Sequence, residues 1–111
     1  MNGNPNSRQK DWHNWLRDHG CFICYSYPSI HHIKGSKMKL KGFVKPGEDY
    51  VIPLCYEHHQ GSSGIHTSKK LFVDNFGTEK EMFRTLVDQH EEDNGEMPMD
   101  ELTFNAIVER A

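Results

Sequence analysis

Large apolar side chains are scarce in this chain, and so are cysteines. Hydrophobic residues make up 35% of the 111 residues, which is little for a domain that must bury a core on its own. No apolar run is long enough to cross a bilayer, and the polar N-terminus carries no signal-peptide pattern. Three cysteines are an odd number, which argues against a disulfide framework and favours reduced thiolates on a metal in the cytoplasm. We therefore expect one domain in which a structural metal contributes to folding.

The formal net charge of -3 conceals a gradient along the chain. Residues 1–45 carry 8 Lys/Arg and 2 Asp/Glu, whereas residues 91–111 carry 1 and 7. A basic segment suits a polyanionic partner, because phosphate contacts dominate nucleic-acid affinity. The alternative is a solvated lysine-rich loop. The lysines of this segment are Lys34, Lys37, Lys39, Lys41 and Lys45.

Two pairs of metal-binding residue types have two residues between their members. Cys21 and Cys24 form the first pair, and Cys55 and His58 form the second. Thiolate and imidazole are the ligands that zinc prefers, and this spacing lets both members of a pair reach one ion. The four residues predict a closed structural zinc site. The alternative is that the cysteines are small buried residues and the histidine is incidental.

Four further histidines lie near these pairs. His31 and His32 are neighbours in an expected strand, so their side chains point to opposite faces. One can then bind a second metal while the other faces a substrate, or one is simply packed. His59 directly follows a zinc ligand and is expected to project away from that zinc. His66 lies seven residues later across a Gly-Ser-Ser-Gly turn and is either a further ligand or a helix-terminal residue without a role.

Hydrophobic periodicity and breakers predict a small mixed α and β domain. Strands are expected at 30–33 and 50–54, joined by a loop, so that the pairs of metal ligands lie at the two ends of a hairpin. A helix over 8–19 should bury Trp12, Trp15 and Leu16, and Thr78 to Glu81 has the pattern of a capping box. A helical turn is expected near Glu57, followed by a helix over 67–76 whose apolar residues are Leu71, Phe72 and Phe76. The next helix should direct four residues inward: Met82, Phe83, Leu86 and Val87. A linker is expected over 91–99, and a last helix over 100–110 should present Leu102, Ile107 and Val108.

The order of these motifs resembles the HNH endonuclease family, and more narrowly its phage-type branch related to the recombination-enhancement nucleases. The motifs are Cys-x-x-Cys, Ile-His-His-Ile, Ile-Pro-Leu-Cys-x-x-His-His-Gln-Gly and Gly-Ile-His. The resemblance implies an α+β fold, a small zinc-stabilised ββα-metal core with flanking helices. It divides the chain into a flexible N-terminus (1–7), a nuclease core (8–77) and a C-terminal helical extension (78–111).

The resemblance also implies a role for each motif. The protein would be a phage- or prophage-encoded endonuclease in the bacterial cytoplasm, cutting DNA to leave a 5′-phosphate and a 3′-hydroxyl, with a recombination or phage DNA-processing protein as a candidate partner. By this resemblance His32 would be the general base, and one catalytic divalent metal (Mg²⁺, Mn²⁺, Ni²⁺ or Zn²⁺) would be bound by His31, His59 and His66. The structural Zn²⁺ would be bound by Cys21, Cys24, Cys55 and His58. The five lysines would contact DNA.

The chain departs from the family pattern at two places. The central Asn of the HNH motif has no match before Ile52-Pro53-Leu54, where Glu48, Asp49 and Tyr50 stand instead. Asp49 is the candidate to orient His32 or the loop. His58 occupies a position where many relatives carry cysteine, which zinc tolerates.

Two other classes of function fit parts of the pattern. A non-catalytic zinc module could bind nucleic acid or a protein through the lysines; it would hold one zinc, have no second metal site and cut nothing. A thiol redox enzyme built on Cys21 and Cys24 lacks the βαβ context of thioredoxin-type motifs. Neither alternative gives the four spare histidines a shared purpose.

Overall fold

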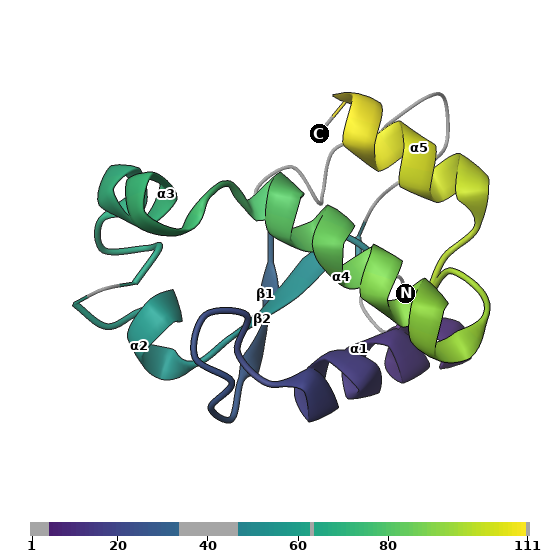
Figure 1. Ribbon diagram of the computed structural model, residues 1–111, viewed down its shortest axis with the longest axis horizontal. Coiled ribbons are helices and arrows are strands. Elements are labelled where there is room, and N and C mark those ends of the chain that lie inside the picture. The colour runs from purple at the N-terminus through teal and green to yellow at the C-terminus, as the bar shows by residue number, and fades with distance from the viewer. Residues whose placement is uncertain (1–4, 34–46, 63, 111) are drawn as a thin grey trace.

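The computed structural model describes residues 5–33, 47–62 and 64–110, which form an α+β fold (Figure 1). The five lysines expected to contact DNA lie outside these residues. The elements in the described ranges are α1 (Ser7–His19), β1 (Ser29–His32), β2 (Val51–Leu54), α2 (Tyr56–His59), α3 (Lys69–Phe76), α4 (Glu79–Asn94) and α5 (Glu101–Arg110).

The first helix, α1, forms as expected and supplies a wall of the core. Asn6 caps its N-terminus in a reciprocal capping box with Gln9, and Gly20 ends it with a φ of 88°. Trp12 and Leu16 are completely buried, and Trp15 packs against them at the edge of the core. This confirms the predicted apolar face of the helix.

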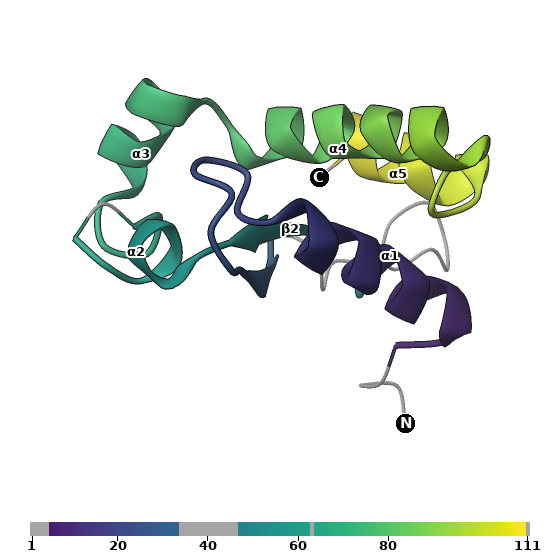
Figure 2. The same cartoon turned by 60° about the horizontal axis from the view of Figure 1, so that its bottom comes forward.

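The predicted hairpin is present, although each strand begins one residue away from its expected start. β1 pairs antiparallel with β2, with His31 opposite Ile52 and His32 opposite Val51. Helix α1 contacts both strands, and α4 contacts β2 (Figure 2). The two-stranded sheet therefore lies between two long helices that are distant in sequence.

The predicted start of α4 is correct, but its predicted end is wrong. Thr78 and Glu81 form the expected capping box. The helix then continues through Asn94 and ends at Gly95, which adopts the left-handed conformation, so residues 91–94 are not part of a linker. No Gly or Pro interrupts this acidic stretch, and the indole Nε1 of Trp15 donates a hydrogen bond to Asp93 at 3.1 Å.

The C-terminal helices share one hydrophobic core with the hairpin. Phe83 of α4 is completely buried. Its ring meets Tyr50 edge-on, with the ring centroids 5.0 Å apart, and stacks on Phe104 of α5, with the centroids 6.0 Å apart. The expected inward residues of α4 are all buried: Met82, Phe83, Leu86 and Val87.

Two apolar residues expected on buried helix faces are exposed. Leu102 is 63% exposed because it lies about 140° around α5 from the buried Ile107. Leu71 is 56% exposed, whereas its neighbour Phe72 is buried. Phe76 of α3 and Phe104 and Val108 of α5 pack against the core instead. Among the described helices, none has the length and apolar character needed to cross a membrane.

Replacing Phe83 by alanine should lower the free energy of unfolding by about 3–5 kcal/mol, because it leaves a cavity where α1, α4, α5 and the hairpin meet. Leu102→Ala is the matched control and should change it by less than about 0.5 kcal/mol. Urea unfolding of the zinc-loaded proteins measures both. Equal effects of the two substitutions would contradict the shared core.

Candidate metal centres

Three cysteines and one histidine converge beside one end of the hairpin. The donor atoms of Cys21, Cys24, Cys55 and His58 all lie within 4.8 Å of one another. The sulfurs of Cys24 and Cys55 are 3.6 Å apart, and His58 Nδ1 lies 3.2 Å from the sulfur of Cys55 and 3.7 Å from that of Cys21. The structure thus brings together all four predicted zinc ligands.

These distances match a tetrahedral zinc site. Ligands bound at about 2.3 Å for sulfur and about 2.0 Å for nitrogen lie roughly 3.5–3.8 Å apart at the corners of a tetrahedron. Four ligands from protein close the coordination sphere, which is typical of a structural site rather than a catalytic one. The cluster is therefore compatible with a structural metal such as zinc.

The turn that carries Cys21 and Cys24 requires an unusual backbone. A Cβ on Gly20 would lie 2.4 Å from the carbonyl oxygen of Tyr25, and Tyr25 itself has a positive φ of 65°. The amide of Ile23 points at the sulfur of Cys21, at 3.4 Å. The tight turn thereby directs both sulfurs toward Cys55.

The cysteine environments shift thiol pKa values in opposite directions. A hydrogen bond from the Ser26 hydroxyl, 2.8 Å away, lowers the pKa of Cys24 to about 6 and favours its thiolate near neutral pH. Burial raises the pKa of Cys21 above its usual value. Metal binding at this cluster must therefore release a proton from Cys21.

Three of the four spare histidines form a second cluster. Donor nitrogens of His31, His59 and His66 all lie within 4.8 Å of one another, and the three ring centroids are 4.7 to 5.1 Å apart. His31 is buried, His59 is half-buried and His66 is exposed. Such a cluster, with one side open to solvent, leaves coordination positions for water and substrate, as catalytic metal sites do.

His59 and His66 meet because the segment between them folds back tightly. The amides of Ile65 and His66 donate to the carbonyls of His58 and His59, at 3.0 and 3.2 Å. A Cβ on Gly64 would approach the His59 carbonyl oxygen to 2.9 Å, so glycine permits this return. His58 and His59 are successive residues of α2 and serve different clusters, as predicted.

Hydrogen bonds on the outer side of the second cluster set which ring nitrogens carry protons. His31 Nε2 lies 2.7 Å from a carboxylate oxygen of Glu79, so Nε2 donates to that oxygen. The Ser29 hydroxyl donates to the Leu54 carbonyl at 3.2 Å and lies 3.3 Å from His59 Nδ1. His31 Nδ1 and His59 Nε2 lie 3.0 Å apart, within hydrogen-bonding distance.

The inner nitrogens of the cluster are close enough for one imidazole to donate to the other or for both to bind one ion. A second proton is disfavoured, since burial and the neighbouring imidazoles of His31 and His66 lower the pKa of His59 to about 4. The cluster therefore offers three imidazole nitrogens close enough together to bind one divalent metal.

His32 lies apart from the three-histidine cluster and faces a carboxylate. Its Nε2 donates to Glu48 at 2.8 Å, which leaves a lone pair on Nδ1, and its side chain is 46% exposed. The ring of His13 anchors Glu48 by donating from Nε2 to its backbone carbonyl at 2.8 Å. Of the two roles expected for Asp49, the structure favours the loop: Asp49 pairs with Arg8 at 3.0 Å, and Glu48 contacts His32 instead.

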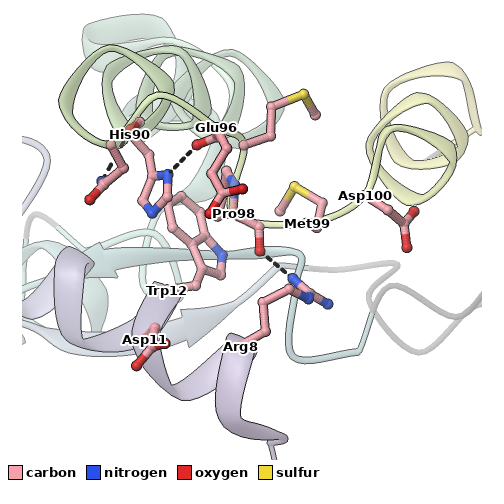
Figure 3. A pocket seen from close by; sticks show the side chains of 10 residues that line it. Arg8, Asp11, Trp12, His90, Glu96, Pro98, Met99 and Asp100 are labelled. Carbon is pink, nitrogen blue, oxygen red and sulfur yellow. Dashed lines mark hydrogen bonds between the residues drawn. The ribbon is translucent and has the colours of Figure 1, made fainter.

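A pocket of about 520 Å³ lies elsewhere, between α1 and the segment that joins α4 to α5 (Figure 3). Arg8 donates to the Pro98 carbonyl across it, and carboxylates of Asp11, Glu96 and Asp100 line it. Its negative lining opposes a polyanion, and neither metal cluster borders it. The pocket is therefore no candidate for a phosphodiester site.

Sequence reasoning missed Glu48, Lys69 and Glu79. The capping box starting at Thr78 indicates only a helix start, and nothing local links Glu79 to a histidine 48 residues earlier. Comparison with protein-family models, curated proteins and solved structures finds no match for the chain. The assignments below therefore depend on the geometry of the two clusters.

Cys55→Ser should remove the structural metal, because one of four ligands is lost from a closed site, and should lower the free energy of unfolding by several kcal/mol. His66→Ala, in the other cluster, should retain one zinc per chain. Elemental analysis and urea unfolding report both quantities. A full complement of zinc in Cys55→Ser would rule out the four-ligand site.

Acid should destabilise the protein through His59 when the second cluster holds no metal. The pKa of His59 is lowered from 6.5 to about 4 in the folded state, so the unfolded chain binds its proton more readily and stability falls as pH drops through this range. Wild type should lose more stability than His59→Gln between these pH values. Paired urea titrations would measure the difference, and parallel losses would show that His59 is not shifted.

Proposed function

We propose that the protein is a metal-dependent endonuclease of the HNH type, which hydrolyses DNA phosphodiester bonds. The observation that carries the proposal is the convergence of His31, His59 and His66, whose donor nitrogens lie within 4.8 Å of one another with one side open. A separate cysteine-rich cluster suited to structural zinc supports it, because the second site is then free for chemistry.

In this proposal the three histidines hold one divalent metal beside the scissile phosphate. A divalent cation held there supplies positive charge that stabilises the developing negative charge on the phosphate and leaving oxygens. The histidines themselves are neutral donors, so they add no negative charge that would repel the substrate. The exposed face at His66 is the side from which a phosphodiester approaches.

His32 is the proposed general base. Its Nε2–H is committed to Glu48, so Nδ1 can take the proton from the attacking water, and the Glu48 carboxylate then stabilises the imidazolium. Because neighbouring side chains of a strand point to opposite faces, the proposal requires the phosphodiester to reach both His31 and His32 around the edge of β1. Glu48 takes the orienting role for which the sequence offered Asp49.

Substrate contacts beyond the reacting phosphate are proposed for two groups of residues. The five lysines between residues 34 and 45 supply positive charge for the DNA backbone. Two tyrosines near the cysteine cluster are strongly exposed, at 84% and 74%, and present rings on which unpaired bases can stack: Tyr27 and Tyr56.

His32→Ala should lower the rate of DNA cleavage by about 10²- to 10⁴-fold while zinc content and fold are retained, because only the proton acceptor is lost. Glu48→Gln should have a smaller effect, since the amide oxygen still accepts from His32. Supercoiled plasmid and circular single-stranded DNA are incubated with each protein in Mg²⁺, Mn²⁺, Ni²⁺ or chelator.

The matched control is His19→Ala, because His19 lies outside both clusters and packs on Trp15 and Tyr25. It should cut DNA like wild type. A fully active His32→Ala would refute the assignment of the base. Absence of cleavage with every metal, together with a single tightly held zinc, would instead favour a non-catalytic zinc module that binds nucleic acid or a protein.

A further inference from the structure

We propose that Glu79 is the positioning residue of the second metal site: it holds the His31 ring with Nε2 toward α4 and Nδ1 toward the metal, and Lys69 holds Glu79. The proposal deepens the function above and rests on its metal site. It adds helices α3 and α4 to a site whose ligands come from β1, α2 and the turn after α2.

The contact between Glu79 and His31 is short and buried. Glu79 Oε2 lies 2.7 Å from His31 Nε2, and the two residues are 8% and 4% exposed. The nitrogen that Glu79 contacts is the one remote from the cluster, while Nδ1 faces His59. Glu79 therefore acts on the ligand from behind and occupies no coordination position.

Lys69 fixes the second carboxylate oxygen. Its Nζ lies 3.3 Å from Glu79 Oε1, so the two oxygens of Glu79 have different partners on different elements. A carboxylate held at both oxygens cannot rotate without losing one contact. The ring plane of His31 is thus fixed by a chain of contacts that begins on α3.

Glu79 is the first residue of α4, where the helix dipole favours a carboxylate, but this position does not require the carboxylate to be buried. Thr78 and Glu81 already form the capping box, through both the Thr78 side chain and its backbone amide. A carboxylate buried to this degree costs free energy unless it is paired, so an ordinary helix position would favour an exposed or uncharged residue. The contact with His31 offsets the cost of burying the Glu79 carboxylate.

A carboxylate behind a ligating histidine has a known physical effect. It fixes the tautomer, orients the ring and raises the basicity of the nitrogen that binds the metal, and its loss typically weakens metal affinity about 10- to 100-fold. Glu79 meets these conditions for His31. At His59 the corresponding partner is only the hydroxyl of Ser29.

The test is a titration of the zinc-loaded protein with Co²⁺, followed by calorimetry and by visible absorption, which separates histidine-bound from thiolate-bound cobalt. Zinc keeps the cysteine cluster because it binds such sites more tightly than cobalt. Glu79→Ala should weaken Co²⁺ affinity roughly 10- to 100-fold, and Glu79→Gln, which retains an acceptor oxygen, should weaken it less.

A spectroscopic measurement separates positioning from a merely structural role. Nitrogen-15 NMR of the cobalt-free protein should show His31 protonated on Nε2 in wild type and in Glu79→Gln, and a mixture of tautomers in Glu79→Ala. The matched control is Glu91→Gln, at an exposed glutamate of the same helix, which should match wild type in both measurements.

Unchanged Co²⁺ affinity and an unchanged His31 tautomer in a folded Glu79→Ala would overturn this inference, whether or not wild type cuts DNA. Weakened affinity in Glu79→Ala with no DNA cleavage by wild type would leave it standing and refute the endonuclease alone. If Glu79→Ala fails to fold, the comparison of Glu79→Gln with Glu91→Gln decides: equal affinities overturn the inference, and a loss confined to Glu79→Gln supports it.

Discussion

The register of the two-stranded hairpin is the constraint on which both metal clusters depend. Pairing Ser29 with Leu54 brings the turn that carries Cys21 and Cys24 next to Cys55. The same register turns His31 toward α2. A slip of one residue would exchange the faces of neighbouring side chains, so His32 would replace His31 in the cluster and leave Glu48. A sheet of four paired positions is too small to enforce this alone, and the packing around it must do so.

The packing that fixes this register comes from helices near both ends of the chain. Trp12 of α1 donates its indole Nε1–H to the Asp49 carbonyl at 3.0 Å, which fixes the segment entering β2. Phe83 of α4 packs on Trp12 and on Tyr50. Helix α4 also carries Glu79, so the helix that packs on the hairpin also contacts His31, the proposed metal ligand. Packing and the proposed chemistry are thus coupled through one rigid element.

Local patterns made the elements and the ligand pairs predictable, whereas long-range contacts were not. Each predictable feature involves residues only a few positions apart: the spacing of Cys21 and Cys24, the capping box at Thr78, and the helical period of Trp12 and Leu16. The partner of His31 lies 48 positions away, and only the tertiary fold identifies it. The end of α4 was missed because acidic residues near 91–94 resemble a linker, while a contact from Trp15 stabilises them as helix.

The different ligands of the two clusters give them opposite charges, and this difference suits different tasks. Three thiolates and one neutral histidine around Zn²⁺ leave a net charge of minus one, which neither attracts a phosphodiester nor leaves a position for it. Three neutral histidines leave the full double charge of a divalent cation. Glu79 alone would cancel half of that charge, but Lys69 neutralises Glu79 in turn. In the proposed metal site, the carboxylate could therefore orient His31 while its negative charge is offset by Lys69.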